Sequence, residues 1–117
     1  MLVTPVAGEL IEVYTKVGLA ASVDTPKQKV PSGASSLAIF VDNGDDSATT
    51  VDIDVEWSPD GDNWFDAATT DEFAQLTADE KIVKVFTVKG AWFRCEITIG
   101  GTADTDITIR ALGIAGT

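Results

Sequence analysis

The chain has 117 residues, of which 44% are hydrophobic, and its 19 acidic and 8 basic side chains give a net charge of −11. This length suits one domain with a single core, and the apolar content argues against a disordered chain. The negative charge repels phosphate and anionic lipid, so we expect neither nucleic acid nor a membrane surface as a partner. The N-terminus does not have the pattern of a signal peptide, which predicts a protein that starts out in the cytoplasm.

Alternation of apolar and polar residues predicts three β-strands, and a content rich in β-forming residues predicts three more. In residues 10–17, the expected apolar face consists of Ile11, Val13 and Val17. The next runs are residues 37–41 and residues 50–57, and the latter has the clearest alternation, with Val51, Ile53, Val55 and Trp57 on one side. Residues 91–99 alternate in the same way, whereas residues 82–88 and 107–114 are apolar on both sides, which is typical of central strands or of a subunit contact.

Turn-forming clusters rich in Gly, Asn and Asp separate these strands. Only residues 71–81 fit a short helix, and a loop with one helical turn is the alternative for them. Several short strands joined by such turns predict an all-β, single-domain antiparallel β-sandwich of jelly-roll-like form, with a barrel as the alternative. We expect residues 9–117 to form this domain and residues 1–8 to form a flexible N-terminal arm or an edge strand.

The residues needed for catalysis are not apparent in the sequence. The chain has no His, which removes the commonest general base and metal ligand. Asp52, Asp54 and Glu56 recur at strand spacing on a face expected to be wet, where nothing should raise their pKa values. Cys95 is the single cysteine, which excludes an intrachain disulfide, and its alternation with Phe93 predicts a small buried side chain. We therefore predict no enzyme, no catalytic residue and no cofactor.

Asp60, Asp62 and Asn63 place hard oxygen ligands close together on one loop, as calcium sites do. Their spacing is not that of an EF-hand, and Asp and Asn also favour tight turns by bonding their own backbone. We predict no metal site, and these three residues are kept as weak candidates.

The tryptophans suggest where the chain contacts other molecules. Trp57 alternates with core residues, whereas Trp92 precedes the core-facing Phe93 and should point outward, and Trp64 closes an acidic turn. An outward Trp is an interface anchor more often than a platform for a sugar ring. The full set of predicted interface residues is Trp92, Trp64, Leu2, Val3, Pro5, Ile107 and Ile109.

One segment resembles a known group of proteins. The turn Ser58-Pro-Asp-Gly-Asp-Asn-Trp64 follows an alternating strand, and a later strand opens with Gly-Ala-Trp-Phe-Arg at residues 90–94. This combination, spread over residues 50–112, is similar to small β-sandwich virion proteins of tailed bacteriophages. The resemblance implies a capsid decoration or cement protein that binds the major capsid protein on the outer face of a head, as a trimer or dimer, after synthesis in the host cytoplasm.

Other functions remain open for such a domain. One alternative is a carbohydrate-binding β-sandwich module, which would use outward tryptophans. Another is a tail or fibre component of the same kind of virion. A third is an extracellular adhesion domain, which would be expected to carry an export signal. Each is a binding or assembly function, so the sequence predicts a protein that acts through its surfaces.

Overall fold

The computed structural model describes residues 6–44, 50–69, 71–100 and 104–116, and within them the regular structure is entirely β. Its ten strands are β1 (Leu10–Leu19), β2 (Val23–Asp24), β3 (Gln28–Lys29), β4 (Ala34–Asn43), β5 (Thr50–Ser58), β6 (Phe65–Asp66), β7 (Glu72–Leu76), β8 (Glu80–Thr87), β9 (Trp92–Gly100) and β10 (Thr105–Ala115). The predicted all-β class is confirmed.

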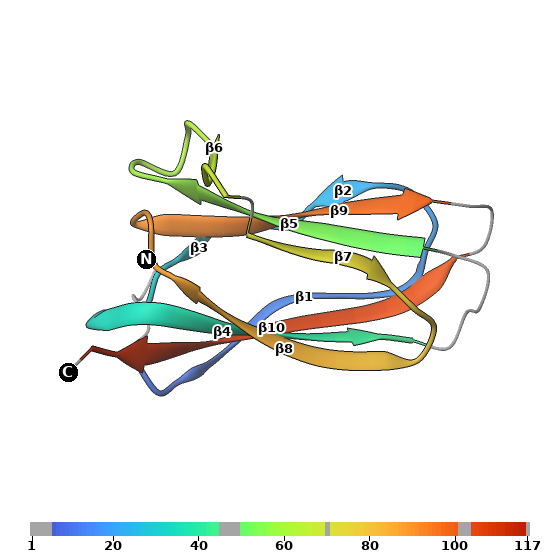
Figure 1. The fold of residues 1–117 in the computed structure, drawn as a ribbon, viewed down its shortest axis with the longest axis horizontal. Helices are drawn as coiled ribbons and strands as arrows, with labels where there is room; N and C mark the ends of the chain where they lie inside the picture. The colour runs from blue at the N-terminus through green and yellow to red at the C-terminus, as the bar shows by residue number, and fades with distance from the viewer. Residues whose placement is uncertain (1–5, 45–49, 70, 101–103, 117) are drawn as a thin grey trace.

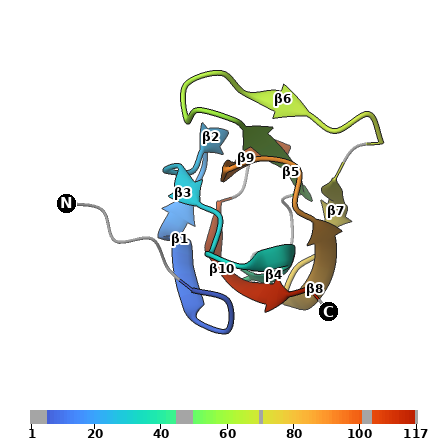
Figure 2. The same ribbon diagram turned by 90° about the vertical axis from the view of Figure 1, so that its left-hand side faces the viewer.

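The strands form two antiparallel sheets that pack face to face (Figure 1). Sheet I has the order β1-β10-β4-β8, and sheet II has the order β2-β9-β5-β6, with β3 also pairing with β9 and β7 with β5. The end-on view shows the two sheets on opposite sides of a common interior (Figure 2). Among the described strands no pairing joins the two sheets into a closed barrel, so the sandwich prediction holds and the barrel alternative does not.

The strand order is that of a jelly roll. The first strand pairs with the last, β1 with β10; β2 and β3 pair with β9, β4 with β8, and β5 with β7. The chain therefore pairs as one long hairpin, and rolling that hairpin adds the contacts β10–β4 and β9–β5. Neighbouring strands of the hairpin consequently lie in different sheets, and each sheet receives strands from both halves of the chain.

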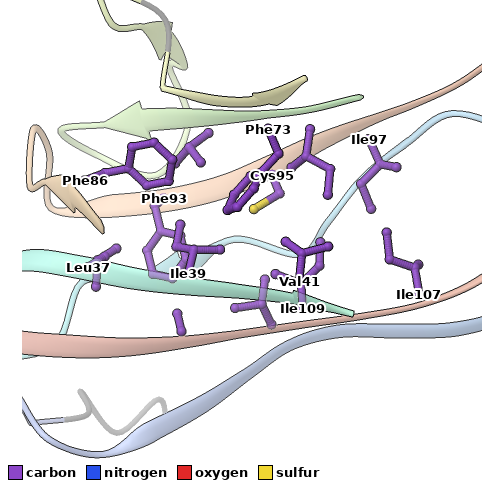
Figure 3. Close-up of a cluster of buried hydrophobic side chains, with 14 of the residues drawn as sticks. Leu37, Ile39, Val41, Phe73, Phe86, Phe93, Cys95, Ile97, Ile107 and Ile109 are labelled. Carbon is purple, nitrogen blue, oxygen red and sulfur yellow. The ribbon is translucent and has the colours of Figure 1, made fainter. Parts of the chain in front are cut away.

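The core fills the space between the sheets (Figure 3). All four apolar residues predicted on β5, from Val51 to Trp57, are buried, as are Phe93 and Cys95 on β9. Sheet I supplies Leu37, Ile39 and Val41 from β4. Each such side chain stabilises the fold by about 1.5–3 kcal/mol relative to exposure, and this packing fixes which face of each strand remains outside.

The predicted face of β1 is wrong at one position. Val17 is 79% exposed, whereas Val13 and Leu19 are buried. The pairing of β1 with β10 shifts register between Glu12 and Tyr14 and again between Lys16 and Leu19. An extra residue in one strand reverses the facing of those that follow, which turns Val17 to solvent.

Residues 71–81 form neither of the two conformations expected of them. They contain β7, a turn and the start of β8, and β7 buries Phe73 and Leu76. Gln75 has a positive φ of 49°, and its N–H donates to the Asp52 carboxylate at 2.7 Å. This irregularity makes both apolar residues face the core despite their helix-like spacing.

Of the predicted arm or edge strand, residues 1–5 lie outside the described residues. Val6 forms a parallel bridge with Ser32, and the N–H groups of Ala7 and Gly8 donate to Ser32 and Gly113. Residues 6–8 thus lie along the end of the sandwich.

Candidate interaction surfaces

The outer face of sheet I carries a row of apolar side chains that crosses all four strands. The register places Leu10 opposite Leu112, Leu112 opposite Ala38, and Ala38 opposite Val85. Leu10 and Val85, at the two ends of this apolar row, are 56% and 59% exposed. An antiparallel sheet with one face in water normally presents polar residues there, so the apolar row makes this face a candidate contact surface.

The next row of residues extends this apolar surface on β4 and β8, whereas on β10 and β1 the residues of that row are polar. Phe40, which is 38% exposed, lies opposite Val83, which is 48% exposed. Arg110 is the other neighbour of Phe40 and donates to Glu12 at 2.9 Å. One row further along, Lys81 pairs with Asp42 at 3.3 Å and Thr15 bonds Thr108 at 3.0 Å. An apolar centre bounded by paired polar groups is the usual composition of a protein contact surface.

The outer face of sheet II has the opposite chemistry. The register places Asp24 opposite Glu96, Glu96 opposite Asp54, and Asp54 opposite Glu72. Four carboxylates therefore lie in one line across β2, β9, β5 and β7, and this acidic row is flanked by Glu56 opposite Asp66. Like charges directly opposite one another on neighbouring strands are destabilising.

This crowding changes the ionisation of two members of the row. Partial burial, followed by the nearby charge of Glu72, raises the pKa of Asp54 above its ordinary value. Burial and the charge of Glu56 likewise raise the pKa of Glu96. The expectation that nothing would raise the pKa values of the β5 acids is thus wrong for Asp54, because the fold buries it partly and places acidic residues of β7 and β9 opposite it.

Arg94 compensates part of this negative charge. Its Nε donates to Glu56 at 2.8 Å, and a terminal nitrogen lies 3.7 Å from Asp24. Carboxylate oxygens of Asp24, Glu56 and Glu96 lie within 4.8 Å of one another, a spacing that suits a cation. The guanidinium group of Arg94 already supplies positive charge to this carboxylate cluster. In the sequence, the sign of the cluster was a basic residue on β9 between strands that carry alternating acids.

Both predicted tryptophan anchors are half-buried on the outer side of sheet II, and each is covered by cations of its own chain. Lys27 and Lys29 place their ammonium groups 5.1 and 5.3 Å from the centre of the Trp92 ring. The Arg94 guanidinium carbon lies 4.4 Å from the centre of the Trp64 ring. Cation–π contacts of this kind stabilise the local structure, and they leave less ring surface for a partner than the sequence suggested.

Gly61 fits closely against the same Trp92 ring. A Cβ at Gly61, which has a φ of +83°, would lie 3.2 Å from the ring, and Lys27 also donates to the Gly61 carbonyl at 3.2 Å. The Ser58–Trp64 turn is therefore held on Trp92 within the protomer.

The weak metal candidates form the hydrogen bonds of that turn. The Asp60 carboxylate accepts bonds from the N–H groups of Asp62 and Asn63, both at 2.9 Å, and from the Asn63 side chain at 2.7 Å. These donors hold the pKa of Asp60 well below its usual range. Asp62 lies 3.8 Å from Lys27. The arrangement is that of an Asx-type turn.

The remaining interface candidates are not available on the described surface. Ile107 and Ile109 are 1% and 0% exposed, so their prediction as contact residues is wrong: they point into the core, and the apolar residues on the outer side of β10 are Leu112 and Ile114. Leu2, Val3 and Pro5 lie outside the described residues.

Comparison with protein-family models and with curated proteins gave no match to this chain. In the part of the chain that the structure describes, no helix is long and apolar enough to cross a membrane.

Proposed function

We propose that this protein is a non-enzymatic structural component of a virion that binds the outer face of a tailed-phage head and stabilises contacts between capsomers. The observation that carries the proposal is the apolar row on the outer face of sheet I. The jelly-roll sandwich is in keeping with it, since this architecture is common in viral and lectin domains. The partner is the major capsid protein, and the protein acts as a homo-oligomer on the capsid exterior.

The two outer faces have different roles in this proposal. Sheet I buries its apolar row against the capsid, and each square ångström of apolar surface removed from water contributes about 25 cal/mol. Sheet II remains in solvent, where its acidic row keeps free copies and coated particles from associating non-specifically. Stabilisation of the head then comes from one copy contacting two neighbouring capsomers.

A carbohydrate-binding module is the second candidate, and one depression favours it. Exposed Phe65 lies beside Trp57, Asp66 and Lys89 around a small hollow next to β6. An aromatic ring flanked by charged groups is suited to a sugar. Quenching of Trp fluorescence by soluble glycans would support this function, and loss of that quenching in Phe65→Ala would locate the site.

The test of the virion proposal begins with particles banded on a density gradient. We expect this chain at a copy number comparable to that of the major shell protein when both are quantified by mass spectrometry. A few copies per particle would instead place it in the tail or a fibre, and absence from particles would overturn the proposal.

A second step addresses the surface itself. Purified Leu10→Lys protein should bind undecorated heads at least tenfold more weakly than the wild type, because it places a charge in the apolar row. Val17→Lys is the matched control, since Val17 is on the same strand, is exposed and lies outside the row. Equal binding by both variants would show that the apolar row does not contact the head.

A further inference from the structure

β8 is an open edge of sheet I. Among the described strands it pairs only with β4. Its register runs without a shift from Ser36 opposite Thr87 to Asn43 opposite Glu80. Natural edge strands are commonly interrupted by a bulge or a proline, which prevents pairing with other chains. β8 has neither.

The backbone groups on this open edge belong to the same residues as the exposed valines. Val88 donates its N–H to Ser35 at 3.0 Å, and in an antiparallel ladder every second residue then bonds the same neighbour. Phe86 and Lys84 thus direct their N–H and C=O groups toward β4. Val83 and Val85 direct theirs away from it, toward the open edge.

Charged side chains on an edge strand often prevent pairing with another chain, and the lysines of β8 are the candidates for this role. Lys81 pairs with Asp42 on β4. Lys84 donates to the Glu72 carbonyl at 3.0 Å and lies 5.5 Å from the centre of the Phe73 ring. Lys84 thus contacts its own protomer, whereas Lys81, whose side chain is 73% exposed, forms a surface ion pair with Asp42.

We propose that β8 is the subunit contact of the homo-oligomer, pairing antiparallel with β8 of a second copy about a two-fold axis. The inference rests on the proposed function in one respect: that function requires a homo-oligomer, and the β8 contact is assigned as its subunit contact. Pairing Val83 with Val85 of the second copy uses only edge-facing backbone groups. It also joins the two sheets I into one continuous sheet and brings the exposed valines and Phe40 of both copies together.

The distribution of charge favours a second copy at this edge. Two chains of net charge −11 repel one another, and the acidic row makes sheet II the least favourable face for self-association. After Glu80, its first residue, β8 contains Lys81 and Lys84 and no acidic residue. In this register Lys84 lies opposite Lys84 of the second copy, and each ammonium group remains bonded to the Glu72 carbonyl of its own protomer. The contact avoids the repulsion between two acidic rows, and an antiparallel pair of identical strands satisfies two-fold symmetry without any other partner.

The test is sedimentation velocity of the purified chain over a concentration series up to about 100 µM. We expect a dimer for the wild type and a monomer for Val85→Pro, which removes one edge-facing N–H without breaking the bonds to β4. Val85→Thr is the matched control: it keeps the N–H and the branched side chain and should remain dimeric. Circular dichroism and the melting temperature verify that each variant folds.

If Val85→Pro does not fold, the double variant Val83→Lys, Val85→Lys replaces it, because charged side chains block the edge while every backbone group is retained. A wild type that stays monomeric throughout the series, or a folded edge variant that dimerises as the wild type does, would overturn the inference. A wild-type dimer that is absent from phage particles would overturn the proposed function and leave the β8 contact standing.

Discussion

Replacing Asp54 with Asn should increase the free energy of unfolding at pH 7. Asp54 faces Glu96 on one side and Glu72 on the other in the acidic row. Each like-charge pair across neighbouring strands costs on the order of 0.5 kcal/mol, so removing one charge relieves two pairs and gains about 1 kcal/mol. For a domain of this size the gain corresponds to a rise of about 3–4 °C in melting temperature.

The assay is thermal and urea unfolding of wild type and variant at low ionic strength. Glu9→Gln is the control, since it removes one negative charge next to β1 and outside the acidic row. The advantage of Asp54→Asn should shrink in high salt, because partly exposed charges are screened. An equal gain in Glu9→Gln would show that net charge, rather than the row, is responsible, and no gain in Asp54→Asn would refute the energetic assignment.

The same prediction has a pH dependence. The pKa values of Asp54 and Glu96 are raised in the folded state, so the folded protein binds their protons more readily than the unfolded chain does. Stability of the wild type should therefore increase as the pH falls from 7 through these raised pKa values. The window ends at the ordinary carboxylate pKa of the unfolded chain, about 4, below which the contributions of Asp60 and Glu80, whose pKa values are lowered in the folded state, are progressively lost. Asp54→Asn should show a smaller increase across the window.

Two further predictions concern the interior. Cys95 should not react with iodoacetamide in the native protein, because burial raises the pKa of its thiol to about 12; rapid labelling without denaturant, followed by mass spectrometry, would contradict its place in the core. Gly90→Ala should destabilise the fold by about 1–3 kcal/mol in urea unfolding, since the added Cβ would lie 2.8 Å from the Ser58 carbonyl oxygen; an unchanged midpoint would contradict the close packing of these two segments.

The strands themselves were predictable from local pattern. The alternation from Val51 to Trp57 identified both the element and its buried face, and all six predicted runs lie on strands. The pattern is informative because the period of side-chain facing in a strand is fixed at two residues. Where a bulge breaks that period, as at Val17, the same reasoning fails.

The two rows were not predictable, because they depend on pairing between distant segments. Leu10 looks like an isolated exposed residue until β1 pairs with β10 and places it beside Leu112. Likewise, the acids of β5 appear to be ordinary wet positions until β9 and β7 bring Glu96 and Glu72 opposite Asp54. Ile107 and Ile109 were misassigned for the same reason, since a strand apolar on both sides does not reveal which side faces the other sheet.

The rolled hairpin explains how one short chain presents two unlike surfaces. The chain passes repeatedly from one sheet to the other, so the outer face of sheet I is drawn from β1, β4, β8 and β10, and that of sheet II from the strands between them. The two outer faces are therefore formed by different residues, and the core lies between the two sheets. Joining copies through β8 would extend the apolar face of sheet I while leaving every acidic row exposed. Self-association and a charged outer surface are thus compatible in this fold, because the residues that serve one do not serve the other.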